Sequence, residues 1–355
     1  MKHNFNSGPA VLPPEVLEEA KAGIDNFRDS GVSVLSIPHR SSWFVEVMED
    51  SRRMVRQLMQ LNDDYDVLFL HCGATMQFIQ FPYNFLPSQG KAAYCFNGVW
   101  GKKAINEAKA FGQVNIACSS EDKNHNYLRK KLAIDGDEAY LHLTTNNTIE
   151  GTQWHEIPSV AIPMVADMTS DIFSRQLPFD KFSFIYAGAQ KNLGIAGVTL
   201  VVIKKGSLVE ADRYVPSLLS YNKHIDANSI LNTPPVFAVY CSWLMLKWII
   251  AQGGLAEMER RALERSTLLY ASLDELELYN KPVAIEDRSL MNAVFTISDP
   301  KVEKLFLQEC ELNGFVGVKG HRSVGGLRVS MYNALPLESV KVLCQFLKWF
   351  QEKHG

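Results

Sequence analysis

Asp66-Val-Leu-Phe-Leu-His-Cys-Gly73 is the stretch that decides the fold. Its short apolar run predicts a buried strand, and the glycine that closes it predicts a turn into the helical spacing of residues 76–85. The strand pattern returns later, with another helical stretch at 100–111, and these further strands are expected at 91–96, 139–144 and 162–167. Buried strands that alternate with helices predict an α/β fold, in which a mainly parallel sheet is covered by helices on both faces.

The sequence on either side of this region predicts the rest of the chain. Before it, a helix is expected to start after Pro13-Pro14 and end at Gly31, and a second helix covers 43–61. After it, we expect strands at 183–188, 197–204, 292–297 and 326–332, and helices at 236–251, 255–273, 302–313 and 337–351. The predicted organisation is an N-terminal arm over residues 1–15, a large domain over 16–259 and a smaller α/β domain over 260–355.

The composition is that of an ordinary globular protein with more than one core. The chain has 355 residues, and 46% of them are apolar. A formal net charge of -3 gives no strong field that would attract nucleic acid or an anionic membrane. The apolar run at 236–251 is shorter than the roughly 20 residues of a membrane span, so it predicts a helix buried in a core or a subunit interface.

The cysteines and the N-terminus point to a cytoplasmic protein. Six cysteines are spread over the chain without a CxxC pair, which is typical of a reducing compartment and not of a disulfide framework. The first residues lack the apolar core of a signal peptide. We expect no metal site.

A single lysine stands among small residues where a predicted strand ends. The segment is Tyr186-Ala-Gly-Ala-Gln-Lys-Asn-Leu-Gly194, and its lysine is Lys191. A lysine that forms an imine needs open space beside its amine and a partly dry site that lowers its pKa. A solvated lysine in a turn would give the same local pattern, so this segment alone leaves both interpretations open.

Asp167 closes another predicted strand, shortly before Lys191 in the sequence. Ligands of open α/β sheets bind at the carboxyl ends of strands. A pyridoxal ring needs a carboxylate beside its pyridinium nitrogen and a lysine at its aldehyde, and two strand ends of one sheet can supply both groups. An acid in this place can also be only a strand terminus or a helix cap.

Other turns carry residues suited to the same cofactor. Gly73-Ala74-Thr75 opens a helix whose free N–H groups can bind a phosphate, although an ordinary β-to-α turn looks the same. Trp100 can stack on a flat ring or belong to a core, and Thr148 can bond to the phenolic oxygen of the ring. Asn232-Thr-Pro-Pro235 suits either phosphate contact or a helix-entry turn. Walker and GxGxxG motifs are absent, so nucleotide binding has little support.

Taken together, these motifs resemble the phosphoserine aminotransferases, a family of fold-type I, class-V aminotransferases, over nearly the whole chain. The segments that carry the resemblance are Phe5-Asn-Ser-Gly-Pro-Ala10, Pro38-His-Arg40, the Lys191 segment, Asn232-Thr-Pro-Pro235, Lys319-Gly-His-Arg322 and Gly325-Gly-Leu-Arg328. The resemblance implies a seven-stranded, mainly parallel sheet in the large domain and pyridoxal 5′-phosphate as cofactor. It also implies reversible amino transfer between glutamate and 3-phosphohydroxypyruvate, giving O-phosphoserine and 2-oxoglutarate in serine biosynthesis. Use of a phosphorylated hydroxythreonine in pyridoxine biosynthesis is also implied.

The resemblance further implies roles for single residues. Lys191 matches the lysine that holds the cofactor, and Asp167 matches the partner of the ring nitrogen. Further matched cofactor contacts are Ala74, Thr75, Trp100, Thr148 and Gln190, and Asn232 and Thr233 match residues that reach the cofactor of the neighbouring subunit in a homodimer. The matched substrate contacts are Ser7, His39, Arg40, His321, Arg322 and Arg328.

One departure from the family pattern and three competing functions remain. Residues 71–78 carry no arginine, whereas some family members have one in the phosphate loop. A cysteine desulfurase would need a mobile cysteine near the cofactor, and an alanine–glyoxylate aminotransferase would need fewer cations. A cofactor-free scaffold protein would have no use for the combination of Lys191, Asp167 and Trp100.

Overall fold

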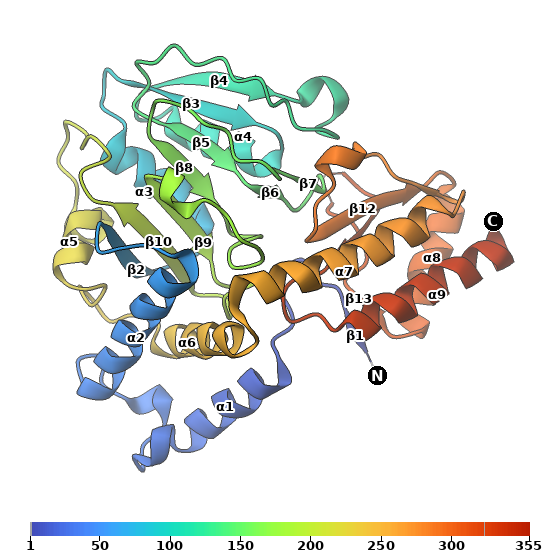
Figure 1. Ribbon diagram of the computed structural model, residues 1–355, viewed down its shortest axis with the longest axis horizontal. Helices are drawn as coiled ribbons and strands as arrows, with labels where there is room; N and C mark the ends of the chain where they lie inside the picture. The colour runs from blue at the N-terminus through green and yellow to red at the C-terminus, as the bar shows by residue number, and fades with distance from the viewer. Residues whose placement is uncertain (1, 323) are drawn as a thin grey trace.

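The large unit is built on a seven-stranded sheet (Figure 1). The computed structural model describes residues 2–322 and 324–355. In spatial order the strands are β2 (Tyr65–His71), β10 (Val198–Lys204), β9 (Phe184–Gly188), β8 (Met164–Asp167), β5 (Leu141–Thr144), β3 (Lys91–Phe96) and β4 (Gln113–Ser119). β10 runs antiparallel to both of its neighbours, β2 and β9, and the four other pairings in this sheet are parallel. The predicted α/β fold with a mainly parallel sheet is therefore confirmed.

The strands are buried on both faces because their side chains alternate between two layers of helices. In β2, Val67 and Phe69 pack on one layer, whereas Leu68 and Leu70 pack on the other. The first layer contains α1 (Pro14–Asp25), α2 (Ser42–Met59) and α6 (Val236–Ala251), and the second contains α3 (Ala74–Phe85), α4 (Val99–Ala108) and α5 (Tyr221–Asp226). Burial on two faces explains the continuous apolar runs that predicted the strands.

Helix α6 is apolar all round because other helices surround it. It packs against α1, α2 and α7 (Gly254–Asp274), and its residues Val239, Leu246 and Ile249 are fully buried. Within residues 2–322 and 324–355, no single helix is long and apolar enough to cross a membrane; α6 and α7 meet that criterion only as a pair, across a bend of 84°. The packing therefore agrees with the prediction of a core helix at 236–251.

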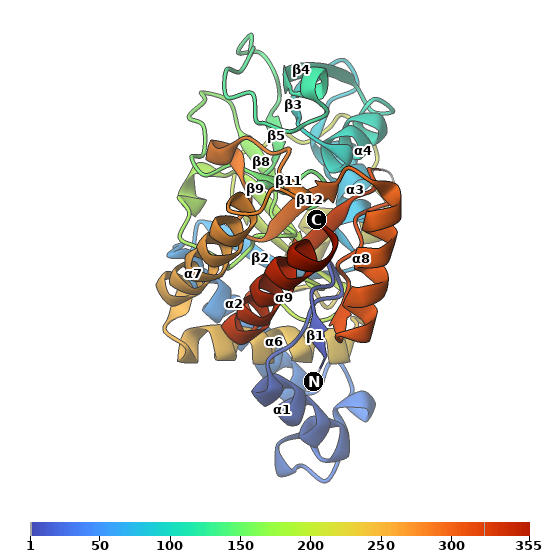
Figure 2. The same cartoon turned by 90° about the vertical axis from the view of Figure 1, so that its right-hand side faces the viewer.

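A second core lies beside both termini, on the right of Figure 1 and facing the viewer in Figure 2. Its elements are β11 (Tyr279–Asn280), β12 (Asn292–Ile297), β14 (Leu327–Ser330), α7, α8 (Pro300–Leu312) and α9 (Leu337–His354). The N-terminal β1 (His3–Asn4) pairs with β13 (Phe315–Val316), and Phe5 is fully buried in this core. The N-terminal segment is thus packed into the core that the C-terminal part of the chain forms. The predicted boundary at residue 260 falls within α7, and the division into domains stays a prediction.

Some elements differ from the sequence predictions for identifiable reasons. The first helix ends at Asp25 and not at Gly31, because Asn26 is extended and its side chain accepts a hydrogen bond from the Gly31 N–H. The edge strand β4 was not predicted, because none of its first four residues is buried and polar residues interrupt its apolar run. Other elements too short for periodicity are β6 (Asn146–Asn147), β7 (Thr152–Gln153) and the 3₁₀ turns Phe27–Asp29, Val34–Ser36, Glu121–Lys123, Phe179–Lys181, Ser217–Leu219 and Ile285–Asp287.

Candidate active site

A cavity of about 310 Å³ lies at the carboxyl ends of the parallel strands. Its lining comes from the β2–α3 turn, the start of α4, the end of β8, the turn after β9, the N-terminal segment and the region around β14. Ten of the residues singled out in the sequence line it: Ser7, Ala74, Thr75, Trp100, Thr148, Asp167, Gln190, Lys191, His321 and Arg328. Distant parts of the sequence therefore converge on one cavity, where ligands of α/β sheets bind.

Lys191 lies in the tight turn after β9, with little room around its stem. A Cβ atom added at Gly8 would come within 3.4 Å of Lys191 Cγ, and Lys191 Nζ lies 5.9 Å from the centroid of the Trp100 ring. Burial lowers the pKa of Lys191 to about 8, and the charge of Arg328 also lowers it, whereas Asp167 and Asp171 raise it. A substantial fraction of the amine is therefore neutral near pH 8, as a nucleophile or a base requires.

Asp167 is a buried carboxylate that borders the cavity. It is 5% exposed, and its Oδ1 accepts a hydrogen bond of 3.0 Å from the Thr169 N–H. Burial raises the pKa of Asp167, while the Thr169 hydrogen bonds and the charge of Lys191 lower it. A positively charged ring nitrogen brought into the cavity would offset the cost of burying this carboxylate.

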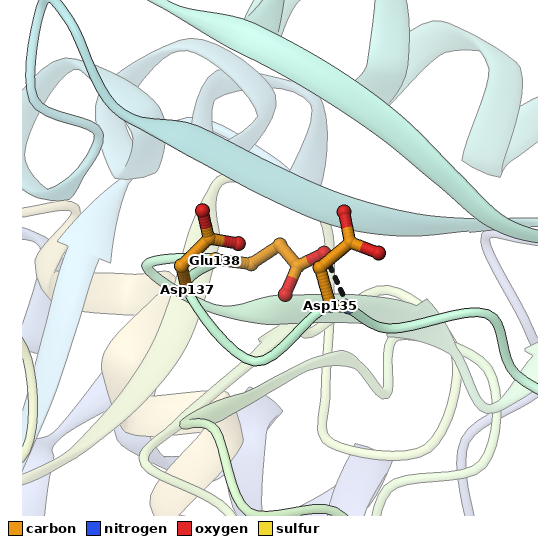
Figure 3. A group of neighbouring side chains, drawn as sticks. All are labelled: Asp135, Asp137 and Glu138. Carbon is orange, nitrogen blue, oxygen red and sulfur yellow. Dashed lines mark hydrogen bonds between the residues drawn. The ribbon is translucent and has the colours of Figure 1, made fainter.

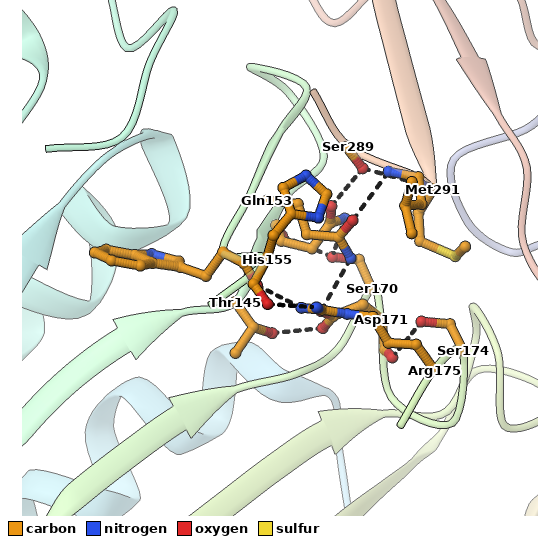
Figure 4. A network of polar contacts seen from close by, with 12 residues as sticks. Thr145, Gln153, His155, Ser170, Asp171, Ser174, Arg175, Ser289 and Met291 are labelled. Atoms are coloured by element: carbon orange, nitrogen blue, oxygen red, sulfur yellow. Dashed lines mark hydrogen bonds and ion pairs between the residues drawn. The ribbon is translucent and has the colours of Figure 1, made fainter. Parts of the chain in front are cut away.

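A polar network behind Asp167 fixes its backbone (Figure 4). The Thr145 N–H donates to the Asp167 carbonyl at 3.0 Å, and the Thr145 hydroxyl donates to the Asp171 carboxylate. Asp171 is fully buried and forms an ion pair of 3.4 Å with Arg175, whose guanidinium also donates to the Trp154 carbonyl. Of these two neighbouring carboxylates, Asp171 is paired inside the protein and only Asp167 faces the cavity.

The first turn of α3 offers backbone donors at another side of the cavity. Its N-cap is Gly73, no side chain caps this helix, and a Cβ atom added at Gly73 would touch nothing within 4 Å. Ala74 and Thr75, the first two residues of the helix, line the open space. Uncapped N–H groups at a helix start form an anion site even without an arginine.

The start of α4 holds Trp100 in place. Trp100 Nε1 donates to Thr148 Oγ1 at 2.9 Å, and the Glu150 carboxylate accepts from the Val99 N–H at 2.8 Å. Glu150 is buried so closely against Gly98 that a Cβ atom there would overlap it at 2.6 Å. One helical turn after Trp100, Lys103 places its Nζ 4.6 Å from the centroid of the indole ring.

Positive charge gathers where Arg328 and His321 line the cavity, here called the cationic wall. Arg328 is 7% exposed and donates to Ser7 Oγ at 2.6 Å and to the Thr148 carbonyl at 3.0 Å. The pKa of His321 is lowered by burial first, and then by the charges of Arg328, Arg322 and Lys103. These basic groups surround one imidazole, so this wall attracts anions.

Five of the residues singled out in the sequence do not line this cavity: His39, Arg40, Asn232, Thr233 and Arg322. Arg40, Thr233 and Arg322 are exposed. His39 Nε2 and Asn232 Oδ1 are buried and have no hydrogen-bond partner within the part of the chain that the structure describes. Sequence reasoning also missed lining residues, among them Gly8, Asn146, Thr169 and Ser170. Thr169 and Ser170 come just after the strand that ends at Asp167. That position at a strand end was the signal by which the sequence could have indicated them as cavity residues.

A group of three acidic residues is not part of the cavity lining (Figure 3). Asp135, Asp137 and Glu138 could bring three carboxylate oxygens together. Lys91 already forms ion pairs with Asp135 at 2.8 Å and with Asp137 at 2.5 Å, and Glu138 accepts the N–H groups of residues 135 and 136. The group therefore stabilises the turn that precedes β5.

Comparisons with known proteins identify the family of the chain. The aminotransferase class-V family matches residues 2–343. The phosphoserine aminotransferase of Flavobacterium johnsoniae is 49% identical over 353 residues, 99% of each chain. The structure of phosphoserine aminotransferase from Bacillus circulans subsp. alkalophilus has a TM-score of 0.97 at 40% identity, covering 100% of this chain and 99% of that one.

A further solved structure, described as phosphoserine aminotransferase from Trichomonas vaginalis with bound PLP, has a TM-score of 0.93 at 33% identity. It covers 98% of this chain and 100% of that one. The curated and the structural comparisons thus extend over both cores and not over one domain alone. The chain belongs to the class-V aminotransferases and, within them, to the phosphoserine aminotransferase family.

Proposed function

We propose that the protein transfers an amino group between glutamate and 3-phosphohydroxypyruvate, giving O-phosphoserine and 2-oxoglutarate in serine biosynthesis. The enzyme is a transaminase that depends on pyridoxal 5′-phosphate. The observation that carries the proposal is that Lys191 and Asp167 border the same cavity as Arg328 and His321, its cationic wall. A cytoplasmic location is also proposed, and the six free cysteines support it.

The residues around the cavity fit the cofactor. The uncapped start of α3, with Ala74 and Thr75, would hold the phosphate, and Asp167 would pair with the ring nitrogen. Trp100 would stack on the ring, and Thr148 and Gln190 would contact its polar edge. When bound, the cofactor supplies an electron sink for the bonds at the substrate Cα.

The protein's own groups then have distinct tasks. Lys191, with its pKa lowered to about 8, can hold the cofactor, can take the Cα proton of the amino donor in one half-reaction and can give a proton to Cα of the ketoacid in the other. Asp167 keeps positive charge on the ring nitrogen by offering a buried negative partner. Arg328 binds the α-carboxylate, because a guanidinium pairs with a carboxylate through two parallel hydrogen bonds.

The phosphate of the ketoacid is assigned to the remaining cations. His321, Arg322 and Lys103 add positive charge beside Arg328, more than one carboxylate needs. In the other half-reaction the same region would receive the side-chain carboxylate of glutamate. The test compares phosphorylated with unphosphorylated hydroxypyruvate, and kcat/KM should differ by at least about tenfold, given ~1.5–3 kcal/mol for each charge-assisted contact. Equal use of the two ketoacids would contradict the phosphate assignment.

The active unit is proposed to be a homodimer with shared sites. Four of the matched residues lie outside the cavity of their own chain: His39, Arg40, Asn232 and Thr233. Two of them, His39 and Asn232, carry buried polar atoms that have no partner among the described residues of this chain and that a neighbouring subunit could satisfy. Mixing inactive Lys191→Ala chains with inactive chains mutated at Asn232 and Thr233 should restore activity under subunit exchange, because one site of each hybrid is intact. Absence of recovery would assign these residues to their own chain.

A cysteine desulfurase is not favoured by the position of the cysteines. None of the described residues that line the cavity is a cysteine. Cys310 lies buried in α8 and Cys344 lies in α9, and burial raises the pKa of both thiols. A thiol in this state is a poor nucleophile.

A further inference from the structure

The N-terminal segment 5–10, here called the strap, runs between the small core and the Lys191 turn. At its start, the Phe5 N–H donates to the Val316 carbonyl at 2.8 Å, and the Phe5 carbonyl accepts from the Ser330 N–H at 3.3 Å. At its end, the Ala10 N–H donates to the Gln190 carbonyl at 2.8 Å. The strap is therefore fixed at both ends to elements that carry cavity residues.

In the middle of the strap, Ser7 is bonded from two sides. Its carbonyl accepts a hydrogen bond of 2.9 Å from the Tyr332 hydroxyl, and its own hydroxyl oxygen accepts one of 2.6 Å from Arg328 Nη2. Any movement of the Ser7 backbone therefore also moves Ser7 Oγ, the atom that accepts the hydrogen bond from the Arg328 guanidinium.

Two successive hydrogen bonds, through Asn292 and Asn146, connect the Tyr332 hydroxyl to the large unit. The hydroxyl accepts a hydrogen bond of 3.3 Å from Asn292 Nδ2, and Asn292 Oδ1 accepts one of 2.8 Å from Asn146 Nδ2. Tyr332 is 2% exposed, and burial raises the pKa of its phenol, so the hydroxyl stays neutral and can donate to Ser7. Successive hydrogen bonds of this kind reinforce one another in a low-dielectric interior.

The orientation of Arg328 depends on few contacts. Nη2 donates to Ser7 Oγ and Nη1 to the Thr148 carbonyl, whereas the buried Nε has no hydrogen-bond partner among residues 2–322 and 324–355. Because the guanidinium is planar, these two anchors fix the direction of its remaining N–H groups. An anion in the cavity would be received in that direction.

We propose that Tyr332 is a positioning residue: by holding the Ser7 carbonyl, its hydroxyl keeps Arg328 oriented toward the substrate α-carboxylate. The inference rests on the proposed role of Arg328. Tyr332 does not line the cavity, so it acts through Ser7 and not by touching substrate. Since every substrate of the reaction carries a carboxylate next to the reacting carbon, its effect is the same for all of them.

Tyr332→Phe removes one oxygen atom and leaves the buried ring in place. In the holoenzyme, KM for glutamate and for O-phosphoserine should each rise by about three- to tenfold, with kcat changed by less than about twofold, because the hydrogen bond that holds the Ser7 carbonyl is lost. The longer bond that the hydroxyl accepts from Asn292 is lost with it, but that bond does not reach Ser7 or Arg328 directly. The dissociation constant of O-phosphoserine, from the change it causes in the visible absorbance of the cofactor, should rise by the same factor.

Tyr279→Phe is the matched control. Tyr279 is 1% exposed, belongs to the small core, and its hydroxyl donates to the Leu347 carbonyl at 2.9 Å, away from the cavity. This variant should lose a comparable amount of thermal stability and keep the wild-type KM values. A rise in KM that both variants share would reflect general loosening and overturn the positioning role.

Two further variants separate the inference from the function on which it rests. In a Ser7→Ala background, Tyr332→Phe should raise KM less than it does alone, because both changes disturb one linkage; full additivity would contradict action through Ser7. Arg328→Lys should raise KM for both substrates. If it does so while Tyr332→Phe has no effect, only the inference fails; if Arg328→Lys leaves KM unchanged, the proposed role of Arg328 fails as well.

Discussion

The floor of the cavity and its cationic wall are built in different ways. The floor residues Asp167 and Lys191 stand at the ends of β8 and β9, adjacent strands of one sheet with a common core. The wall depends on a hydrogen bond between Ser7 and Arg328, which lie 321 positions apart in the sequence. The floor is thus fixed by a single parallel sheet, whereas the wall forms only when both ends of the chain have docked.

The two regions also place their charges differently. Both floor groups are buried. Burial lowers the pKa of Lys191 and raises that of Asp167, so each group can change its protonation or pair with an opposite charge brought into the cavity. On the wall, Arg328 is buried, whereas Arg322 and Lys103, which act on His321 from outside the cavity lining, are exposed to solvent. We therefore expect floor substitutions to affect chemistry strongly and wall substitutions to affect mainly substrate choice and affinity.

The largest expected effect is that of Lys191→Ala. Loss of the base at the substrate Cα should lower kcat by at least about 10³-fold, within the range of general base catalysis combined with loss of covalent attachment. The variant should still fold, because the side chain stands in a turn. Steady-state assays with glutamate and 3-phosphohydroxypyruvate give the measurement, and Lys102→Ala, an exposed lysine on α4, is the control. Turnover within tenfold of the wild type would show that Lys191 is not the base.

The second prediction concerns pH and tests the electrostatic coupling between Lys191 and Asp167. The neutral amine of Lys191 is the form that captures an aldehyde, so the rate at which the cofactor-free protein takes up pyridoxal phosphate should rise with pH. With a pKa of about 8, the rise between pH 7 and 9 should be about tenfold, with its midpoint near pH 8.

Two substitutions should move that midpoint in opposite directions. Asp167→Asn removes a negative charge that raises the pKa of Lys191, so the midpoint should fall below 8. Arg328→Gln removes a positive charge that lowers the same pKa, so the midpoint should rise. Stopped-flow absorbance at a series of pH values measures both. Shifts of the same sign in the two variants would refute this account of how Lys191 is tuned.

The difference between floor and wall also explains what could be predicted from the sequence. Lys191 and Asp167 were recognisable from the residues themselves, because short apolar runs locate strand ends and ligands bind there. Ser7 and Arg328 emerged only from the family resemblance, since no local pattern reports a contact between the two ends of a chain. Tyr332 gave no signal, because a buried tyrosine with a structural hydrogen bond looks the same in sequence as one that orients a neighbour.

The smallest expected effect is that of substituting Lys103, whose charge acts on His321 in the wall. Its ammonium lies above the Trp100 ring, and its charge reaches His321, although the residue is exposed. Residues 71–78 contain no arginine or lysine, so a cation on α4 can supply part of the attraction for the phosphate. Because exposed charges interact weakly, Lys103→Gln should lower the preference for phosphorylated over unphosphorylated hydroxypyruvate by only about two- to fivefold.

Lys102→Gln removes the same charge from the adjacent position and separates a local from a general effect. Lys102 is exposed and points to the Phe96 ring, at 5.7 Å from its centroid, and it does not influence His321. Its substitution should leave the preference unchanged. The Lys103 effect should also shrink as salt is raised toward 1 M, because the screening length then falls to ~3 Å. If Lys103→Gln slows both ketoacids equally and weakens cofactor retention, Lys103 supports the Trp100 ring and contributes nothing to substrate choice. A selective loss with the phosphorylated ketoacid, sensitive to salt and absent in Lys102→Gln, would instead identify the start of α4 as part of the wall that recognises phosphate.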